Sequence, residues 1–250
     1  MLSKITSKED LKRIEPLFTD IRFYMGKSVL EGIMGEVYTD NALSPKFAIL
    51  LVKSFCFISG IIEKEELREI INNNFKNKSI IPSDEICVQI EEIYGERIVK
   101  TQRYSIKKNP SFNISKLKKM TNNLSQEYKI EKIKDDLIDK VREEGFNITT
   151  ENYEKNGIGF CCIYNNEIIG SASSNIFYKD GIEVNVRVKE KYRRKGIATA
   201  MCANLILECI NQNKKISWDA KDMNSVKLAE KLGFEYDSPY NRYKFKKSQE

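Results

Sequence analysis

In the second half of the chain, hydrophobic and polar positions follow the periods of regular secondary structure. Short runs rich in Val, Ile and Phe predict strands, and longer segments with apolar residues three and four positions apart predict helices. The predicted strands are 129–133, 157–164, 167–174, 181–188, 215–219, 234–236 and 241–245. The predicted helices are 134–144, 197–211 and 223–232, the last of which ends at Gly233. This order predicts a mixed α/β domain in which strands 181–188 and 215–219 are parallel and joined by a right-handed crossover.

The first half has a less regular pattern. Helices are predicted at 7–17, 63–74 and 86–94, and strands at 30–38, 48–53, 54–59 and 97–104. Turn residues then gather at Asn109-Pro110-Ser111 and in the polar run 121–125. A linker of this composition places a domain boundary near residue 125. We therefore expect a smaller N-terminal α/β domain over 1–125, which is a candidate for determining the substrate, and a second domain over 126–250.

Composition limits the class of protein. With 41% hydrophobic and 31% charged residues, the chain is typical of a soluble globular protein. Its longest apolar run, 47–62, contains Lys53 and Gly60 and is too short to span a bilayer. The segment from Met1 to Thr6 lacks the pattern of a secretory signal, and the six cysteines show no disulfide framework. We therefore expect a cytoplasmic protein with reduced thiols and no membrane partner.

The chain contains no histidine. This excludes histidine-based triads, Cys–His dyads and histidine metal sites. The spacing of the cysteines and carboxylates suggests no metal site either. The expected chemistry is therefore one that needs neither histidine nor a metal ion.

The net charge of +6 is concentrated in one stretch. Residues 103–126 contain six basic and no acidic side chains, which equals the whole excess. Tyr104 and Phe112 lie in the same stretch, and basic residues mixed with aromatic ones are typical of nucleic-acid binding. Six charges in a linker more often belong to a solvated connector. We favour the connector, and keep nucleic-acid binding through 103–126 as an alternative.

One segment of the second half has the features of a phosphate site. The strand 181–188 leads into a short basic loop that opens directly into the helix 197–211. The first turn of a helix leaves backbone N–H groups unpaired and is the positive end of the helix dipole, so it suits a pyrophosphate. The run Arg193-Arg194-Lys195 supplies charge, and Gly196 lets the backbone approach a phosphate without a Cβ. Thr199 adds a hydroxyl donor.

This loop reads R-x-x-G-x-A from Arg193, and downstream Trp218-Asp219 precedes a helix that ends in Glu230-Lys231-Leu232-Gly233-Phe234. The arrangement resembles the GNAT superfamily of acyl-CoA-dependent N-acyltransferases over residues 182–245, and the order of elements extends the resemblance back to residue 127. The resemblance implies an α/β fold with a mixed, mostly antiparallel sheet that contains a splayed parallel strand pair. The two-part layout is also similar to bacterial acetyltransferases of the zwittermicin-resistance type.

The first half is a candidate for a degenerate GNAT-like half. Phe55-Cys56-Phe57-Ile58 echoes Phe160-Cys161-Cys162-Ile163, although chance explains four residues equally well. Residues 1–125 contain no R-x-x-G-x-A loop and no other glycine-rich phosphate loop. We therefore expect one cofactor site per chain, in the second half.

The resemblance further implies acetyl-CoA as the cosubstrate, and a primary amine of a small molecule or peptide as the acceptor. The amine attacks the thioester directly in a ternary complex, so the reaction needs no enzyme nucleophile. Main-chain groups of Val186 and Val188 are expected to pair with pantetheine, and the loop amides are expected to hold the pyrophosphate. The full set of expected cofactor contacts is Val186, Val188, Arg193, Arg194, Lys195, Gly196, Ile197, Ala198, Thr199, Asp222, Asn224 and Ser225.

Catalysis would then come from positioning, from a backbone N–H near Val186 that stabilises the oxyanion, and from a base. Glu183 is the candidate general base, acting directly or through water. A solvent-facing charge on a strand is the alternative interpretation of this residue. Asn185 alternates onto the same face as Glu183 and is a candidate for positioning the substrate.

Two positions depart from the family pattern. Ala229 stands where many members carry a tyrosine that protonates the leaving thiolate, and Asp222 stands where an asparagine usually contacts the cofactor. The general acid is therefore unassigned, and a catalytically silent acyl-CoA-binding module is the alternative to an enzyme. The acceptor, the acyl chain and the oligomeric state stay open. The tyrosines that remain candidates for the acid are Tyr192, Tyr236, Tyr240 and Tyr243.

Overall fold

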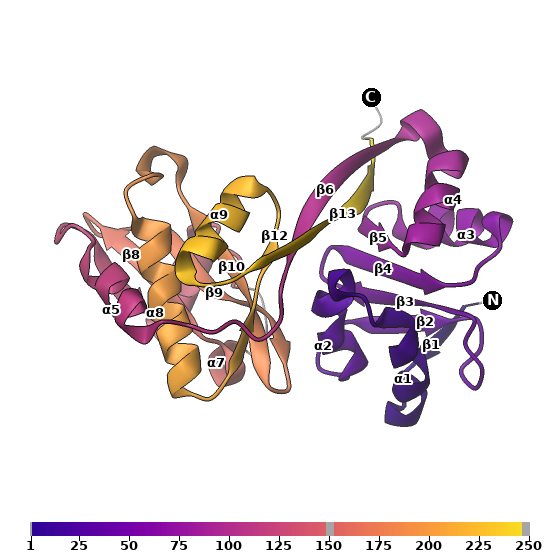
Figure 1. Cartoon of the computed structure of the whole chain (residues 1–250), viewed down its shortest axis with the longest axis horizontal. Coiled ribbons are helices and arrows are strands. Elements are labelled where there is room, and N and C mark those ends of the chain that lie inside the picture. Colours follow the sequence, from indigo (N-terminus) through magenta and orange to yellow (C-terminus); the bar gives the residue numbers. More distant parts are fainter. Residues whose placement is uncertain (1, 149–152, 247–250) are drawn as a thin grey trace. The chain divides into compact units, whose positions relative to one another are not determined.

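The computed structural model describes residues 2–148 and 153–246 (Figure 1). The chain divides into two compact units. Unit 1 comprises the residues up to Ser105 together with those from Ser238 onward, and unit 2 comprises Ile106–Asp237. This division differs from the boundary expected at residue 125, because the end of the chain returns to unit 1 and residues 106–125 belong to unit 2.

Unit 1 is built on a mixed sheet with the strand order β1-β2-β3-β4-β5-β13-β6. Neighbours from β1 to β4 are antiparallel, β4 and β5 are parallel, and β13 is antiparallel to β5. The strands are β1 (Ser3–Ile5), β2 (Glu36–Thr39), β3 (Phe47–Val52), β4 (Phe55–Gly60), β5 (Ser79–Pro82), β6 (Ile98–Ile106) and β13 (Tyr236–Phe245). The helices are α1 (Lys8–Ile14), α2 (Lys27–Leu30), α3 (Lys64–Ile70) and α4 (Asp84–Tyr94), the 3₁₀ helices η1 (Glu15–Phe18), η2 (Ile21–Gly26) and η4 (Gly95–Arg97), and the π-helical turn η3 (Ile71–Phe75).

Unit 2 is built on a second sheet with the strand order β11-β10-β9-β8-β7. Neighbours from β7 to β10 are antiparallel, whereas β10 and β11 are parallel, which confirms the predicted parallel pair. The strands are β7 (Lys129–Lys132), β8 (Gly159–Tyr164), β9 (Glu167–Tyr178), β10 (Gly181–Val188) and β11 (Lys215–Ser217), and a short strand β12 (Asp219–Ala220) follows. The helices are α5 (Ile114–Asn122), α6 (Asp136–Glu143), α7 (Tyr153–Asn156), α8 (Ile197–Asn211) and α9 (Met223–Leu232), with the 3₁₀ helix η5 (Glu190–Tyr192).

Helix α8 is apolar around most of its circumference because it is covered on several sides. It packs against β8, β9 and β10 of the sheet, and α5 runs beside it (Figure 1). Leu117 of α5 is buried in this contact, whereas Lys116, Lys118 and Lys119 are exposed. The basic stretch 103–126 is therefore not a plain connector, since it contains a helix that belongs to the core of unit 2.

Both units repeat one order of elements. A first strand and its helices are followed by three antiparallel strands, a helix, a parallel strand and a second helix. The three strands are β2-β3-β4 in unit 1 and β8-β9-β10 in unit 2, and the parallel strand is β5 or β11. Unit 1 therefore repeats the arrangement of unit 2, as expected of a degenerate second half. The short echo between 55–58 and 160–163 does not reflect this repeat, because it compares β4 with β8, which are not equivalent.

Three predicted strands differ from the structure. The stretch 30–38 is a strand only from Glu36 onward, because Gly32 and Gly35 adopt positive φ angles of 69° and 84° and form a turn. The two short strands expected around Pro239 are one continuous strand, β13. No helix within the described residues has the length and apolar character needed to cross a membrane.

Candidate functional site

Strand β10 separates from its parallel neighbour before its end. Its first three residues, Gly181 to Glu183, pair with β11, which ends at Ser217. On the other side, β9 pairs with β10 as far as Val188. Among the described strand pairs, none continues on the β11 side of β10 beyond Glu183. The expected splay is thus present, and it offers main-chain groups of Val184 to Val188 to a ligand.

The loop after β10 is shaped by two residues with positive φ angles. Arg194 has a φ of 65° and Gly196 has a φ of 82°. Gly196 is the N-cap of α8, and no side chain caps the helix there. A Cβ on Gly196 would meet only Leu124 Cδ1, at 4.0 Å, so it is the left-handed backbone rather than crowding that favours glycine. The strained Arg194 backbone is a feature that clusters at binding sites.

A cavity of about 400 Å³ opens between this loop and helix α9. The loop contributes backbone and basic side chains, and α9 contributes one face. Its lining is Val188, Tyr192, Arg193, Arg194, Gly196, Ile197, Ala198, Thr199, Asn224, Lys227, Leu228 and Lys231. Eight of the residues predicted to contact a cofactor therefore line one cavity, at the head of an apolar helix.

The lining carries four cationic side chains and no acidic one. Arg193 and Arg194 come from the loop, and Lys227 and Lys231 come from one face of α9. Together with the positive end of the α8 dipole, this set favours a ligand that carries several negative charges, such as a pyrophosphate. The residues present thus fit the polyphosphate part of a coenzyme A ester.

Four residues predicted as cofactor contacts lie outside the lining of this cavity. Val186 belongs to the splayed part of β10. The Lys195 amine donates to Tyr128 Oη over 3.3 Å and lies over the ring of Tyr192. The remaining two, Asp222 and Ser225, act at the start of α9. Asp222 is the N-cap of that helix, and its carboxylate accepts a hydrogen bond of 2.9 Å from the backbone N–H of Ser225.

Glu183 is buried, with 4% of its surface exposed, so it is not a solvent-facing charge. Its Oε2 accepts hydrogen bonds from the hydroxyl of Tyr178 at 3.1 Å and from that of Ser217. Its Oε1 is buried and has no hydrogen-bond partner among the described residues. A buried carboxylate with one unpartnered oxygen can take a proton from a group placed beside it.

The surroundings also change the acidity of this carboxyl. Burial first, and then the charge of Asp219, raise the pKa of Glu183 to about 7, although the two hydroxyl donors act in the opposite direction. Burial dominates because the ionised form loses its hydration. A carboxyl with a pKa near neutrality is suited to act as a base at physiological pH.

The other candidate catalytic residues lie at separate places in the fold. Asn185 is partly buried, two residues after Glu183 and beyond the register shift that β9 makes there. Ala229 is fully buried on the inner side of α9. Among the four candidate tyrosines, Tyr192 lines the cavity, and its hydroxyl donates to Glu167 over 3.2 Å. Tyr243 belongs to unit 1 and donates to Glu91.

Sequence reasoning missed five residues of this region: Tyr178, Ser217, Lys227, Leu228 and Lys231. The last three were visible as a pattern, because Asn224, Lys227 or Leu228, and Lys231 repeat at the three- and four-residue spacing of one helix face. The contacts of Tyr178 and Ser217 with Glu183 depend on strand pairing and gave no local signal. Among the described residues there is no group of three or more Cys, Asp or Glu side chains that could hold a metal ion.

Residues 15–243 match the GNAT acetyltransferase family. The chain is also 24% identical over 229 residues to the uncharacterised N-acetyltransferase YdfB of Bacillus subtilis, covering 84% of this chain and 85% of that protein.

Among solved structures, a GCN5-related N-acetyltransferase-like protein from Streptococcus suis is 32% identical, with a TM-score of 0.85, over 95% of this chain and 99% of that one. A tandem GNAT protein from the clavulanic acid biosynthesis pathway covers 97% of each chain with a TM-score of 0.52 at 8% identity, which is a likeness of fold alone.

Proposed function

The chain belongs to the GNAT acetyltransferase family, and from this premise we propose that it transfers the acetyl group of acetyl-CoA to a primary amine of a small molecule or peptide. The observation that carries the proposal is the cationic cavity where the R-x-x-G-x-A loop meets α9. The absence of histidine agrees with a reaction in which the substrates react directly with each other. Amine acetylation from a thioester meets that condition.

The cavity and the splayed strand lie in the order that an extended cosubstrate requires. Arg193, Arg194, Lys227 and Lys231 hold the phosphates, while main-chain groups of Val186 and Val188 pair with the pantetheine arm. From Val188 back to Glu183 the strand spans about 17 Å. The thioester is thereby placed near the start of the splay, beside the buried carboxylate.

The chemistry then needs few groups from the protein. Glu183 accepts a proton from the acceptor ammonium, directly or through water, which frees the nitrogen lone pair. The nitrogen forms a bond to the thioester carbon, and a backbone N–H near Val186 stabilises the oxyanion. The attacking nitrogen, which still carries one proton more than the amide product, gives that proton to water. When the C–S bond breaks, the thiolate leaves and takes a proton from water. Its pKa is near that of a cysteine thiol, about 8.5, so no tyrosine acid is required at Ala229.

A second candidate function rests on one observation. Ala229 is buried and cannot donate a proton where many family members carry tyrosine. A catalytically silent acyl-CoA-binding module would have the same cavity and no turnover.

Release of free thiol from acetyl-CoA across a panel of primary amines separates the two candidates. We expect thiol release that depends on one class of amine and is absent without protein. Binding of acetyl-CoA with no release on any amine would contradict the enzyme and favour the silent module.

A further inference from the structure

The carboxylate of Glu183 lies too deep in unit 2 for a substrate to touch it. Glu183 and the neighbouring Tyr178 have 4% and 6% of their surfaces exposed, and the Oε1 atom of Glu183 is fully buried. Proton transfer needs a chain of groups within hydrogen-bond reach of each other. A base in this position therefore needs a neighbour that passes the proton to it.

Ser217 is placed to be that neighbour. It is the last residue of β11, and it pairs with Glu183 at the point where β10 and β11 separate. Ser217 is half-buried, unlike Glu183 and Tyr178. The next residue, Trp218, is buried, and its indole N–H donates to Ser225 Oγ over 3.0 Å, which fixes the chain just after β11. Ser217 is therefore the polar residue at which the buried network meets the splayed strands.

The hydroxyl of Ser217 has one proton and three acceptors within reach. They are Glu183 Oε2, the Ile182 carbonyl at 3.1 Å and Tyr178 Oη at 3.2 Å. An ionised carboxylate is the strongest acceptor of the three, so the Ser217 proton points to Oε2 when Glu183 is charged. A serine oxygen can accept a proton while it donates its own. Ser217 can thus join a substrate to the buried carboxylate.

The bonds of Oε2 are kept in both protonation states of Glu183. When Glu183 is ionised, Oε2 accepts from Ser217 and, over 3.1 Å, from Tyr178. When Oε2 holds the proton, it donates to Ser217 Oγ and still accepts from Tyr178, while the Ser217 hydroxyl turns to the Ile182 carbonyl. The charge of Asp219 on β12 acts on both states and disfavours the ionised one. Transfer of the proton therefore breaks no hydrogen bond of Oε2.

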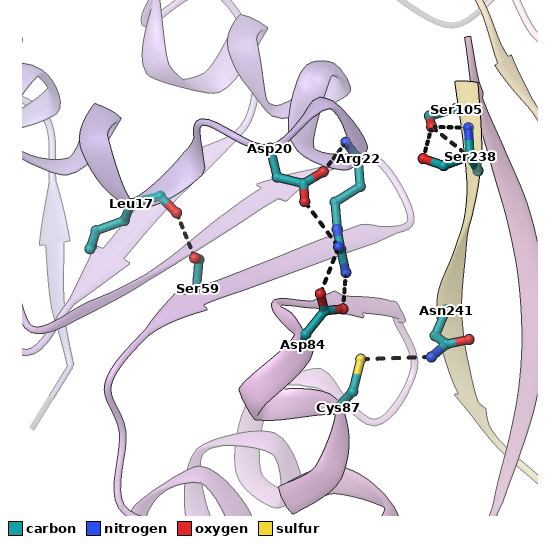
Figure 2. Close-up of polar contacts among 9 residues, drawn as sticks. All are labelled: Leu17, Asp20, Arg22, Ser59, Asp84, Cys87, Ser105, Ser238 and Asn241. Atoms are coloured by element: carbon teal, nitrogen blue, oxygen red, sulfur yellow. Dashed lines mark hydrogen bonds and ion pairs between the residues drawn. The ribbon is translucent and has the colours of Figure 1, made fainter. Parts of the chain in front are cut away.

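The fold itself does not require a hydroxyl and a carboxylate at this place, as unit 1 shows. The last paired residues of its parallel strands β4 and β5 are Ile58 and Pro82, which carry neither group. The start of α4, just after β5, is held instead by Arg22, which donates to both oxygens of Asp84 at 2.6 and 3.1 Å (Figure 2). The polar pair of unit 2 is thus an addition to a shared arrangement, as expected of groups that serve a reaction.

We propose that Ser217 is a catalytic residue that relays a proton from the acceptor ammonium to Glu183. The ammonium N–H proton passes to Ser217 Oγ as the hydroxyl proton of Ser217 passes to Glu183 Oε2. The ammonium becomes a neutral amine, the carboxylate becomes a carboxylic acid, and the serine keeps its hydroxyl. After the product leaves, the reverse path returns the proton from Glu183 to water. This inference rests on the proposed function, and it names the group that the acceptor nitrogen contacts.

Steady-state rates of amine acetylation from pH 5.5 to 9 test the relay. Ser217→Ala should lower the plateau value of kcat by at least about tenfold, because water in place of the hydroxyl restores only part of a general base contribution of about a hundredfold or more. Ser217→Thr keeps a hydroxyl and should retain most of the rate. Tyr178→Phe removes the other donor to Oε2, so it should raise the midpoint of the pH profile above its wild-type value near 7, with a smaller loss of plateau kcat.

Two further comparisons separate a relay from a structural role. The double variant Glu183→Gln, Ser217→Ala should be no slower than Glu183→Gln alone, because both groups act on the same proton. Ser217→Val has nearly the shape of Ser217→Thr and suits a strand, so this pair decides the question if Ser217→Ala is unstable. Acetyl-CoA affinity, measured by calorimetry, should stay near the wild-type value in all these variants. Ser115→Ala, an exposed serine of α5, is the matched control.

A wild-type plateau in Ser217→Ala, whether or not the midpoint moves, would overturn the relay, and so would equal rates in Ser217→Thr and Ser217→Val. Neither result affects the proposed function, since the wild type would still acetylate its amine. A wild type that releases no thiol with any amine would overturn the proposed function and the relay together.

Discussion

Glu183 combines three properties that are seldom found in one carboxylate: burial, one unpartnered oxygen, and a pKa raised to about 7. Its position on β10 was visible in the sequence, but these properties were not. They arise because β11 brings Ser217 beside it and β9 brings Tyr178. Strand pairing across the sheet, rather than local sequence, decides whether a strand carboxylate faces solvent or the interior.

Glu183→Gln should lower kcat for amine acetylation by about a hundredfold or more, because general base catalysis typically contributes at least that factor. The affinity for acetyl-CoA should not change. In the wild type, activity rises with pH as Glu183 loses its proton, with a midpoint near 7, and the variant should lack this rise. Steady-state rates from pH 5.5 to 9 check this. Glu230→Gln, on the exposed side of α9, is the control, and an unchanged rate and pH profile in Glu183→Gln would contradict the assignment.

The same carboxyl affects stability. Glu183 holds its proton more tightly in the folded chain than in the unfolded chain, where its pKa is near 4.5. Its contribution to the free energy of unfolding is therefore present at low pH and is lost as the pH rises to about 7. Between pH 5 and pH 8, the wild type should lose about 2 kcal/mol more than Glu183→Gln. Denaturant unfolding at both pH values measures this, and a parallel loss in the two proteins would rule it out.

Asp222 was expected to contact the cofactor, and in the structure it is the N-cap of α9. Asp222→Ala should cost about 1 kcal/mol of stability, whereas Asp222→Asn should retain most of it. Thermal unfolding gives these values. A binding titration of acetyl-CoA completes the test. If Asp222 acts only as a helix cap, the affinity of both variants stays near that of the wild type. A large loss of affinity in Asp222→Asn at normal stability would restore the predicted contact.

At the scale of elements, the ends of the helices beside the cavity were predictable because they are encoded locally. Gly196 begins α8 with a left-handed backbone, and Gly233 ends α9 with another, at a φ of 110°. Both helices occupy the predicted residues. In the stretch 103–126, local signals were not enough to predict the structure. Its turn residues indicated a linker. The structure instead contains α5, whose buried residue Leu117 packs against α8, and local sequence does not encode this contact.

Helix α9 should contribute to cofactor binding through its charges. The double variant Lys227→Ala, Lys231→Ala should weaken acetyl-CoA binding by about tenfold, and the loss should shrink at high salt. Acetyl-pantetheine lacks the nucleotide phosphates, so its binding should not change. Lys221→Ala removes an exposed lysine just before α9, outside the cavity, and is the matched control. An equal loss for both ligands would mean that the two lysines support the fold of α9 rather than the phosphates.

At the scale of the whole molecule, the chain contains two copies of one arrangement, and only the second has the R-x-x-G-x-A loop that we propose to bind phosphates. In unit 2 the β10–α8 connection contains Arg193, Arg194 and Gly196, whereas in unit 1 β4 passes almost directly into the acidic start of α3. The absence of a second loop was predictable from the sequence. The division of the chain was not, because β13 completes unit 1 by pairing with β5, more than 150 residues earlier.

The most direct test of the central claim is a calorimetric titration of acetyl-CoA into the wild type and into Gly196→Glu, with Gly145→Glu as the control. Gly145 also has a positive φ, of 76°, and lies in unit 2 outside the cavity, so it reproduces the backbone strain without blocking the site. We predict one site per chain in the wild type and in Gly145→Glu, and loss of binding in Gly196→Glu. Unchanged affinity in Gly196→Glu, or a second site per chain, would contradict the account.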